Sequence, residues 1–240
     1  MRLERDPRFQ QESENLIEIK QYFKKKPQVQ IVPRNLAQET YLELLKNPKK
    51  YIVFAIGPAG TGKTMLAVQW AIDQLKTGKM DKIIITRPAV SVDEEHGFLP
   101  GDLNQKMEPW TRPLFDVLAE YYDRKEIARM LDEQIIEISP LAFMRGRTFK
   151  NSWIIADEMQ NATPAQAKML MTRIGTNSKI VITGDVEQAD RSKGDNGLLD
   201  LCSRLERSSV EGIAVCKLEG RDVQRHHIIG PVLKLYEDRR

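Results

Sequence analysis

The stretch Gly57-Pro-Ala-Gly-Thr-Gly-Lys-Thr64 decides the fold that this sequence predicts. It fits the pattern G-x-x-x-x-G-K-[ST] at every fixed position. The glycines let the backbone curl so that successive N–H groups point at phosphate oxygens, and the following helix presents its N-terminus to the same anion. The stretch lies between a β-branched apolar run, Tyr51–Ile56, and an amphipathic one, Met65–Leu75. This strand–loop–helix context is the one that a phosphate-binding loop (P-loop) requires.

The P-loop supplies most of the residues that we expect to bind a nucleoside triphosphate. Lys63 reaches the β- and γ-phosphates and is also expected to act in catalysis, while the Thr64 hydroxyl can ligate Mg²⁺. The predicted nucleotide-binding residues in and beside the loop are Gly57, Pro58, Ala59, Gly60, Thr61, Gly62, Lys63, Thr64 and Met65.

Two acids follow a second apolar run, Trp153–Ala156. Asp157 can hold Mg²⁺ at this position, directly or through water. Glu158 can polarise an attacking water as a general base. Two consecutive carboxylates favour hydrolysis over phosphotransfer, because a phosphotransferase must exclude water from the γ-phosphate. The alternative is that both acids are ordinary residues at the end of a strand.

A third apolar run, Lys179–Thr183, is followed by Gly184, Asp185 and, shortly after, Gln188. The Gln188 carboxamide could contact the γ-phosphate and the attacking water at once, so we expect Gln188 to be a catalytic residue. Asp185 and Asp190 are interpreted either as supporting partners or as turn acids.

Further apolar runs alternate with helical patterns along the chain. The remaining predicted strands are Val29–Val32, Lys82–Thr86, Ile135–Ile138 and Ile213–Val215. A helix capped by Asn35 precedes the P-loop, and the later predicted helices are Arg112–Tyr122, Lys125–Leu131, Pro164–Arg173, Gly197–Leu205 and Val223–Tyr236. This alternation predicts an α/β fold with a mainly parallel sheet covered by helices on both faces. We expect one domain over residues 35–240 after an N-terminal extension of residues 1–34, with a functional loop region at Val90–Pro113.

The composition is that of an ordinary globular protein, with 41% hydrophobic and 30% charged residues among 240. No apolar run approaches the roughly 20 residues that cross a bilayer. The charged N-terminus has no apolar core like that of a secretory signal. Two cysteines, Cys202 and Cys216, suit a reducing compartment. We therefore expect a cytoplasmic protein without a membrane partner, and the net charge of +3 says little about nucleic acid.

Distinctive motifs are spread along the chain from about Gln38 to about His226. They are GPAGTGKT at Gly57, TRPAV at Thr86, GFLPGDL at Gly97, MEPWTRPLFDVL at Met107, PLAFMRGRTF at Pro140, ADEMQN at Ala156, MTRIG at Met171 and GDVEQAD at Gly184. Together these segments closely resemble the PhoH family, the phosphate-starvation-inducible ATPases. The resemblance implies a P-loop NTPase fold like the first RecA-like domain of superfamily-one helicases, with ATP and Mg²⁺ as ligands. Asn196 stands where family members more often have a serine, and the compact form is similar to versions carried by bacteriophages.

The resemblance also implies roles for residues outside the P-loop. Gln38, with Asn35, corresponds to an element in which related helicases read adenine, which favours ATP over GTP. The alternative is that Gln38 faces solvent on its helix. Asp157, Glu158, Gln160 and Asn161 correspond to the acidic-pair segment, and Gly184, Asp185 and Gln188 to the sensor segment.

ATP hydrolysis by helicase-like ATPases usually needs an arginine that offsets the negative charge developing on the γ-phosphate. One RecA-like domain has no second lobe to supply it, so a neighbouring subunit is expected to do so, and the resemblance suggests a ring, with a hexamer favoured. The candidates are Arg87, Arg145, Arg147, Arg173, Arg221 and Arg225, of which Arg225 is the predicted catalytic residue. A surface salt bridge is the alternative role for each. Arg145 and Arg147, flanked by Phe143 and Phe149, could instead contact RNA or single-stranded DNA.

These observations predict a Mg²⁺-dependent ATPase that couples hydrolysis to binding or movement on RNA or single-stranded DNA. A protein-remodelling ring and a small-molecule phosphotransferase are the alternatives. The pair Asp157–Glu158 and the lack of an arginine-rich lid disfavour the phosphotransferase. A non-hydrolysing regulatory module is disfavoured by Lys63, Thr64 and Glu158.

Overall fold

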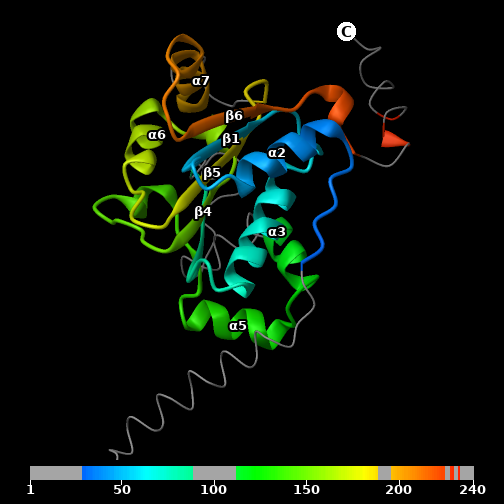
Figure 1. Cartoon of the computed structure of the whole chain (residues 1–240), viewed down its shortest axis with the longest axis vertical. Helices are drawn as coiled ribbons and strands as arrows, with labels where there is room; N and C mark the ends of the chain where they lie inside the picture. Colours follow the sequence, from blue (N-terminus) through cyan, green and yellow to red (C-terminus); the bar gives the residue numbers. More distant parts are fainter. Residues whose placement is uncertain (1–28, 89–111, 189–195, 225–227, 230–231, 233–240) are drawn as a thin grey trace, which may run out of the picture.

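Six parallel strands form the centre of the molecule, in the order β3-β2-β4-β5-β1-β6 (Figure 1). The computed structural model describes residues 29–88, 112–188, 196–224, 228–229 and 232. The strands are β1 (Ile52–Ile56), β2 (Lys82–Thr86), β3 (Ile136–Ile138), β4 (Ser152–Ala156), β5 (Lys179–Gly184) and β6 (Ile213–Lys217). Because every pairing is parallel, all six carboxyl ends lie at the same edge of the sheet.

Helices cover both faces of this sheet (Figure 1). The α-helices are α2 (Leu36–Lys46), α3 (Lys63–Lys76), α5 (Arg124–Asp132), α6 (Pro164–Met171) and α7 (Gly197–Arg207). Residues 112–119 are also helical. The short 3₁₀ helices are η2 (Leu141–Met144), η3 (Met159–Asn161) and η4 (Gly220–Asp222). The apolar residues of α2 and α3 belong to one buried cluster, and those of α6 and α7 belong to a second.

The central strand β1 shows why the fold has three layers. All five of its residues are buried. Val53 and Ala55 belong to the cluster with α2 and α3, whereas Phe54 and Ile56 belong to the cluster with α6 and α7. Successive side chains of a strand point to opposite faces, so an uninterrupted apolar run needs cover on both sides. The predicted α/β fold with a mainly parallel sheet is confirmed.

Most predicted elements are present with ends shifted by a few residues, and one is wrong. Val29–Val32 has no regular secondary structure. Val29 is buried in the cluster with α2 and α3, while Val32 is 70% exposed. Residues 29–32 do not join the six-stranded sheet, whose edge strands are β3 and β6. The β-branched residues of this segment therefore reflect the burial of Val29 and not the pairing of a strand.

Other predictions fall largely outside the described residues. These are the N-terminal extension before residue 29, the loop region Val90–Pro113 for the most part, and most of the helix Val223–Tyr236. Within the last range, Val223 and Gln224 are not helical.

Helix α2 is fixed at both ends, and this places its N-terminus beside the P-loop. At the first turn the Asn35 side chain accepts a hydrogen bond from the Gln38 N–H at 2.8 Å. At the other end the buried Lys179 Nζ donates to the carbonyls of Leu45 (2.6 Å) and Asn47 (2.9 Å). Between the ends, Lys46 and Trp70 link α2 to α3, with the ammonium 5.6 Å from the centre of the ring.

The buried Lys179 makes the stability of the fold depend on pH. Burial lowers the pKa of Lys179 from its ordinary value of 10.5 to about 8. Between these values the unfolded chain binds more protons than the folded one, so this group makes the free energy of unfolding rise with pH.

Lys179→Met should remove this titration. The free energy of unfolding of the wild type, minus that of the variant, should therefore increase from about pH 7.5 to about pH 10. Urea denaturation at constant ionic strength measures this difference, and Lys150→Met at an exposed position is the matched control. Parallel pH curves for the wild type and Lys179→Met would contradict a buried titrating ammonium.

Candidate nucleotide site

The P-loop joins the end of β1 to the start of α3, and two of its glycines are sterically required. Gly62 has φ of 83°, in the left-handed region that only glycine adopts without strain. A Cβ on Gly57 would lie 2.1 Å from the main-chain oxygen of Leu218. The loop can therefore keep this path only with glycine at both positions.

Lys63 lies inside the curve of the loop and is only 8% exposed. Its Nζ donates to the carbonyl oxygens of Gly57 (2.5 Å) and Pro58 (2.7 Å). Burial lowers the pKa of Lys63, and the nearby carboxylates, chiefly Asp185 and then Glu158, act in the opposite direction. The loop thus holds a cation at the place where the motif predicts phosphates.

Two hydroxyls meet the first acid of the pair. Asp157 follows β4 directly, and its N–H donates to the Thr86 carbonyl at 2.9 Å. Its Oδ1 accepts hydrogen bonds from the hydroxyls of Thr64, at 2.8 Å, and Thr183. A hydroxyl beside a carboxylate is a hard oxygen donor set of the kind that suits Mg²⁺, which usually takes one or two protein ligands together with waters and phosphate oxygens. These residues therefore fit the predicted ion.

Thr183 did not emerge from the sequence as a site residue. The available signal was that Thr183, a residue with a hydroxyl, ends an apolar run and directly precedes Gly184. That signal becomes meaningful only when β5 is known to lie beside β4, since the partner Asp157 is 26 positions away.

The second acid has an unusual backbone and a fixed side chain. Glu158 has φ of 54° and ψ of 39°, in the left-handed region. The Gln160 Nε2 donates to Glu158 Oε2 at 2.5 Å, and the Gln160 Oε1 accepts from the Asp185 N–H at 3.1 Å. Gln160 is 3% exposed, and a Cβ on Gly184 would lie 2.7 Å from its Oε1. One buried amide therefore joins the acidic pair to the segment after β5.

The three segments meet around one cavity of about 250 Å³. From the P-loop and α3 it is lined by Ala59, Gly60, Gly62, Lys63, Thr64 and Met65, and from the other two segments by Asp157, Glu158, Gly184, Asp185 and Gln188. The structure thus brings together most of the predicted site residues. Asp190 lies outside the described residues.

Gln38 lies against the P-loop but outside the lining of this cavity. It is 1% exposed, so the alternative in which it faces solvent is wrong. Its Nε2 donates to the Thr61 carbonyl at 3.0 Å, and its Oε1 accepts from the Arg34 N–H at 2.8 Å. The role of Gln38 in reading adenine stays a prediction.

Three of the candidate arginines are held by contacts within the chain. Arg147 makes a two-pronged ion pair with Glu137, with Nη2 and Oε2 2.8 Å apart, and its guanidinium lies 4.5 Å from the centre of the Phe149 ring. This pairing lowers the pKa of Glu137. Arg173 donates to the carbonyls of Arg147 and Met169, and Arg221 pairs with Glu219 at 3.1 Å. Arg145 is exposed, and Arg225 is outside the described residues.

No group of three or more His, Cys, Asp or Glu side chains among the described residues could hold a metal ion. No helix in the described part of the chain is long and apolar enough to cross a membrane.

A P-loop between β1 and α3, with a polar segment after the adjacent strand β5 and an acidic pair after β4, the next strand beyond it, defines a P-loop NTPase fold. The sequence profile of the PhoH-like protein family matches residues 30–237, and this chain belongs to that family. The predicted family and fold are therefore confirmed.

Similar proteins are found in several bacteria. The "PhoH-like protein" of Bacillus subtilis (strain 168) is 45% identical over 204 residues, which cover 85% of this chain and 63% of the relative. The "PhoH-like protein" of Synechocystis sp. is 43% identical over 85% of this chain and 61% of its own length. The "Protein PhoH" of Escherichia coli (strain K12) is 42% identical over 76% of this chain and 52% of its own length. The chain thus spans less than two thirds of each of these relatives.

Solved structures show a more distant likeness of fold alone. The Sulfolobus solfataricus SWI2/SNF2 ATPase core in complex with dsDNA matches 67% of this chain and 33% of its own, with a TM-score of 0.41 and 13% identity. The Pif1 helicase from Candida albicans matches 85% of this chain and 44% of its own, with a TM-score of 0.40 and 15% identity.

Proposed function

We propose that this protein hydrolyses ATP in a Mg²⁺-dependent reaction, in the cytoplasm. The observation that carries the proposal is the single cavity lined by Lys63, Thr64, Asp157 and Glu158. Its groups are those that phosphoryl transfer to water needs: a cation for the phosphates, oxygen ligands for the metal and a carboxylate near the attacking water. The free, buried cysteines Cys202 and Cys216 suit a reducing compartment.

Each side chain has one part in the proposed reaction. Lys63 leaves the carbonyls of its own loop and bonds the β- and γ-phosphates, while Thr64 and Asp157 hold the metal. Mg²⁺ held by these two residues would supply positive charge to the phosphate oxygens. Glu158 accepts a proton from the attacking water. Gln160 holds the Glu158 carboxylate in place, and Gln188 contacts the γ-phosphate.

Two substitutions separate binding from chemistry. Glu158→Gln keeps the size of the side chain and removes its basicity, so the turnover number should fall by about 10²–10⁴-fold with nearly unchanged ATP affinity. Lys63→Ala should weaken ATP binding and abolish turnover, because the loop loses its cation. Steady-state ATPase assays and calorimetric titration with Mg-ATP measure both quantities. A normal turnover number with lowered affinity in Glu158→Gln would make Glu158 a binding residue instead.

We further propose that an arginine from a neighbouring subunit completes the site, in a ring that we expect to be hexameric. Lys63 is the one basic side chain among the described residues that line the cavity. Arg147 and Arg173 are bonded to other parts of their own chain. These contacts disfavour Arg147 and Arg173 as the donor in trans, and among the other candidates Arg225 is our first choice.

Mixing two inactive variants tests the shared site. An Arg225→Ala subunit keeps an intact P-loop but cannot donate the arginine to the adjacent site. A Lys63→Ala subunit lacks a functional P-loop but can still donate Arg225. Co-assembled, the two should recover part of the ATPase activity, because some interfaces pair a sound loop with a sound arginine. The same mixing with Arg145→Ala, and with Arg173→Ala as the chain-internal control, identifies the donor. Constant specific activity in a demonstrably monomeric sample would rule the arrangement out.

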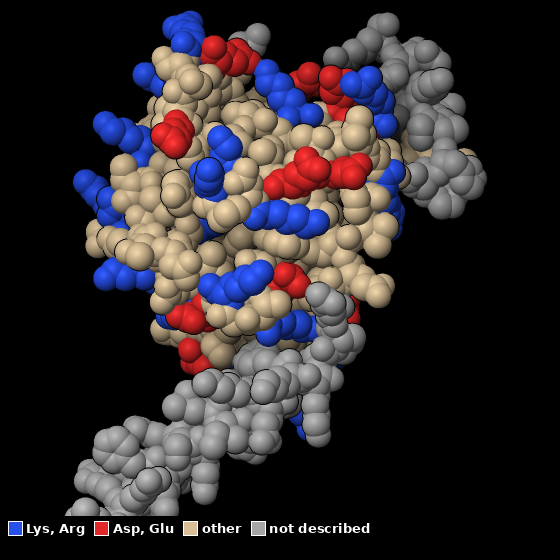
Figure 2. Space-filling view, in the orientation of Figure 1, with Lys and Arg blue, Asp and Glu red and all other residues tan. Residues whose placement is uncertain are grey.

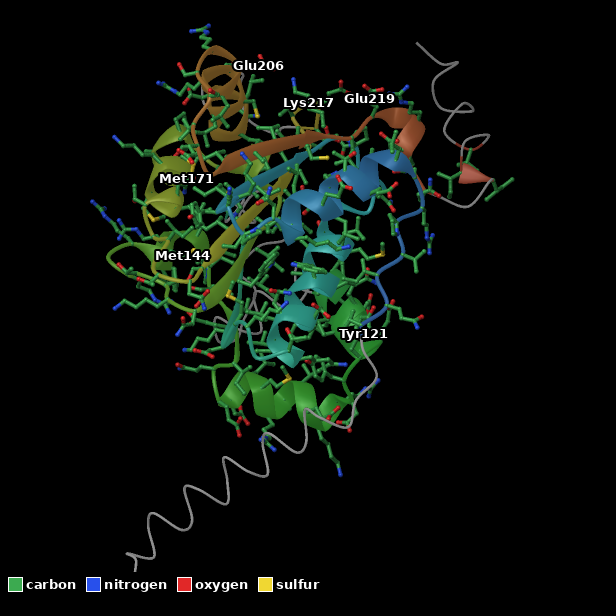
Figure 3. The ribbon with its side chains drawn as sticks, in the orientation of Figure 1. Tyr121, Met144, Met171, Glu206, Lys217 and Glu219 are labelled. Atoms are coloured by element: carbon green, nitrogen blue, oxygen red, sulfur yellow. The ribbon has the colours of Figure 1, made fainter. Side chains whose placement is uncertain are left out.

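RNA or single-stranded DNA is the partner that we propose for this ATPase, and one surface favours it. Phe143 in η2 is 57% exposed, and Arg145 follows it on the same short segment. Figure 3 shows Met144 of η2 and Met171 of α6 on the same side of the molecule, and Lys and Arg side chains gather along that side in Figure 2. Exposed aromatic rings stack on bases and cations neutralise phosphates, so this surface suits a single strand.

Phe143→Ala and Arg145→Ala should each weaken the binding of a fluorescent oligouridine or oligothymidine, Phe143→Ala by about 5- to 100-fold if one base stacks on the ring. Arg124→Ala, at an exposed arginine that begins α5, is the control and should have little effect. The oligonucleotide should also stimulate ATP turnover. Stimulation by an unfolded protein and not by either oligonucleotide would instead support a protein-remodelling ring.

A further inference from the structure

The apex of the P-loop is held by hydrogen bonds from both ends of the described chain. A loop that turns its N–H groups toward phosphates turns its carbonyls outward, where donors from the rest of the chain can fix them, whether the residue is exposed like Gly60 or buried like Thr61. The Gly60 carbonyl accepts from the Gln224 N–H at 2.9 Å. The next carbonyl, that of Thr61, accepts from Gln38 Nε2 at 3.0 Å. Neither donor belongs to a P-loop, acidic-pair or sensor motif.

These two donors are themselves linked. Asn35 Nδ2 donates to the Asp222 carbonyl at 3.2 Å, while the Asn35 Oδ1 caps α2 by accepting from the Gln38 N–H. Asp222 is 8% exposed, and its carboxylate accepts from the Glu219 N–H at 2.8 Å, which closes η4 on itself. We call Asn35, Gln38 and residues 219–224 the apex brace.

The brace is fixed to the sheet immediately before it begins. The Leu218 N–H donates to the Ile56 carbonyl at 2.7 Å, at the point where β1 becomes the P-loop. The Leu218 carbonyl oxygen would lie only 2.1 Å from a Cβ atom at position 57. Residues 219–224 therefore start at one end of the loop and bond to its apex.

We propose that the apex brace sets the affinity of the P-loop for the triphosphate chain, and that nucleotide binding is transmitted through it to residues 219–224. Gln38, Asn35 and the Gln224 N–H are positioning groups, since they act on phosphate through the peptides of Gly60 and Thr61. If a brace bond is lost, its carbonyl can rotate, and the N–H of the same peptide plane turns away from the phosphates. This inference rests on nucleotide binding by the proposed site, but not on hydrolysis.

Gln224→Pro and Gln224→Ala form a matched pair. Proline removes the N–H that reaches Gly60, whereas alanine keeps it. Val223 has φ of −66° and ψ of 119°, the extended conformation that a following proline favours. Isothermal titration with Mg-ATP and with inorganic tripolyphosphate should show about tenfold weaker binding for Gln224→Pro, the effect of one hydrogen bond, and an unchanged Kd for Gln224→Ala. Equal affinities in the two variants would overturn the proposal.

Two side-chain variants test the other bonds without proline. Asn35→Asp keeps the oxygen that caps α2 and loses the donor to Asp222, while Gln38→Glu keeps the acceptor for Arg34 and loses the donor to Thr61. Each should weaken ATP, GTP and tripolyphosphate binding by a similar factor, about tenfold. A loss confined to ATP in Gln38→Glu would mean that Gln38 reads the base and does not position the loop.

Hydrogen exchange tests the transmission. Saturating Mg-ATP should slow exchange of the amides of residues 219–224 by about tenfold in the wild type, and the effect should vanish in Gln38→Glu at matched saturation. Unchanged exchange in the wild type would overturn the proposed transmission to residues 219–224.

The turnover of the wild type is measured on the same samples, which separates the two proposals. A protein that binds nucleotide through the brace without hydrolysing it would refute only the proposed ATPase activity. A wild type that binds none of the three probes would refute both.

Discussion

The site depends on the hydrogen-bonded position of β5 between β1 and β4. The parallel register pairs Ile56 with Gly184 and Ala156 with Ile182, so the P-loop, the acidic pair and the segment after β5 leave the sheet at nearly the same height. A slip of one residue would move every following atom by about 3.3 Å and exchange the two faces of the strand. The hydroxyls of Thr64 and Thr183 could then no longer reach the Asp157 carboxylate. The register of the pairs β1–β5 and β4–β5 therefore determines whether these oxygen atoms come together.

The charges around the cavity suggest that the proposed reaction would benefit from positive charge supplied from outside the cavity. Lys63 is one cation among three carboxylates, those of Asp157, Glu158 and Asp185. A nucleoside triphosphate adds several negative charges to this group, and like charges in a partly buried site repel strongly. A divalent ion offsets part of that excess, and an arginine that arrives with another subunit would offset more. The arrangement therefore makes nucleotide affinity sensitive to any positive group that approaches the mouth of the cavity.

The sequence predicted those parts of the fold and site whose signal is local. The P-loop, the six apolar strands and Asp157–Glu158 are each read from a few consecutive residues, because the physics that forms them acts over one turn or one strand. Thr183 and Gln160 were missed, or left without a role, because their partners are defined by strand order and by a left-handed backbone at Glu158. The Gln224 contact could not be predicted from residue types at all, since the donor is a main-chain N–H that any residue except proline carries. The prediction of a strand at Val29–Val32 failed for the opposite reason, because its local pattern was strong but the segment packs by burying Val29 alone and leaves Val32 exposed.

The contact between Lys46 and Trp70 has a practical consequence. The indole belongs to α3, the helix that begins at the P-loop, and the ammonium over it belongs to α2, the helix that carries Gln38. An ammonium near an indole ring alters the energy of its excited state, so the wavelength and intensity of Trp70 emission depend on the separation of the two helices. Trp70 is one of three tryptophans, and Lys179 lies over the ring of another, Trp153, so a variant that keeps Trp70 alone would report by stopped-flow fluorescence on the junction between α2 and the P-loop, without any attached dye.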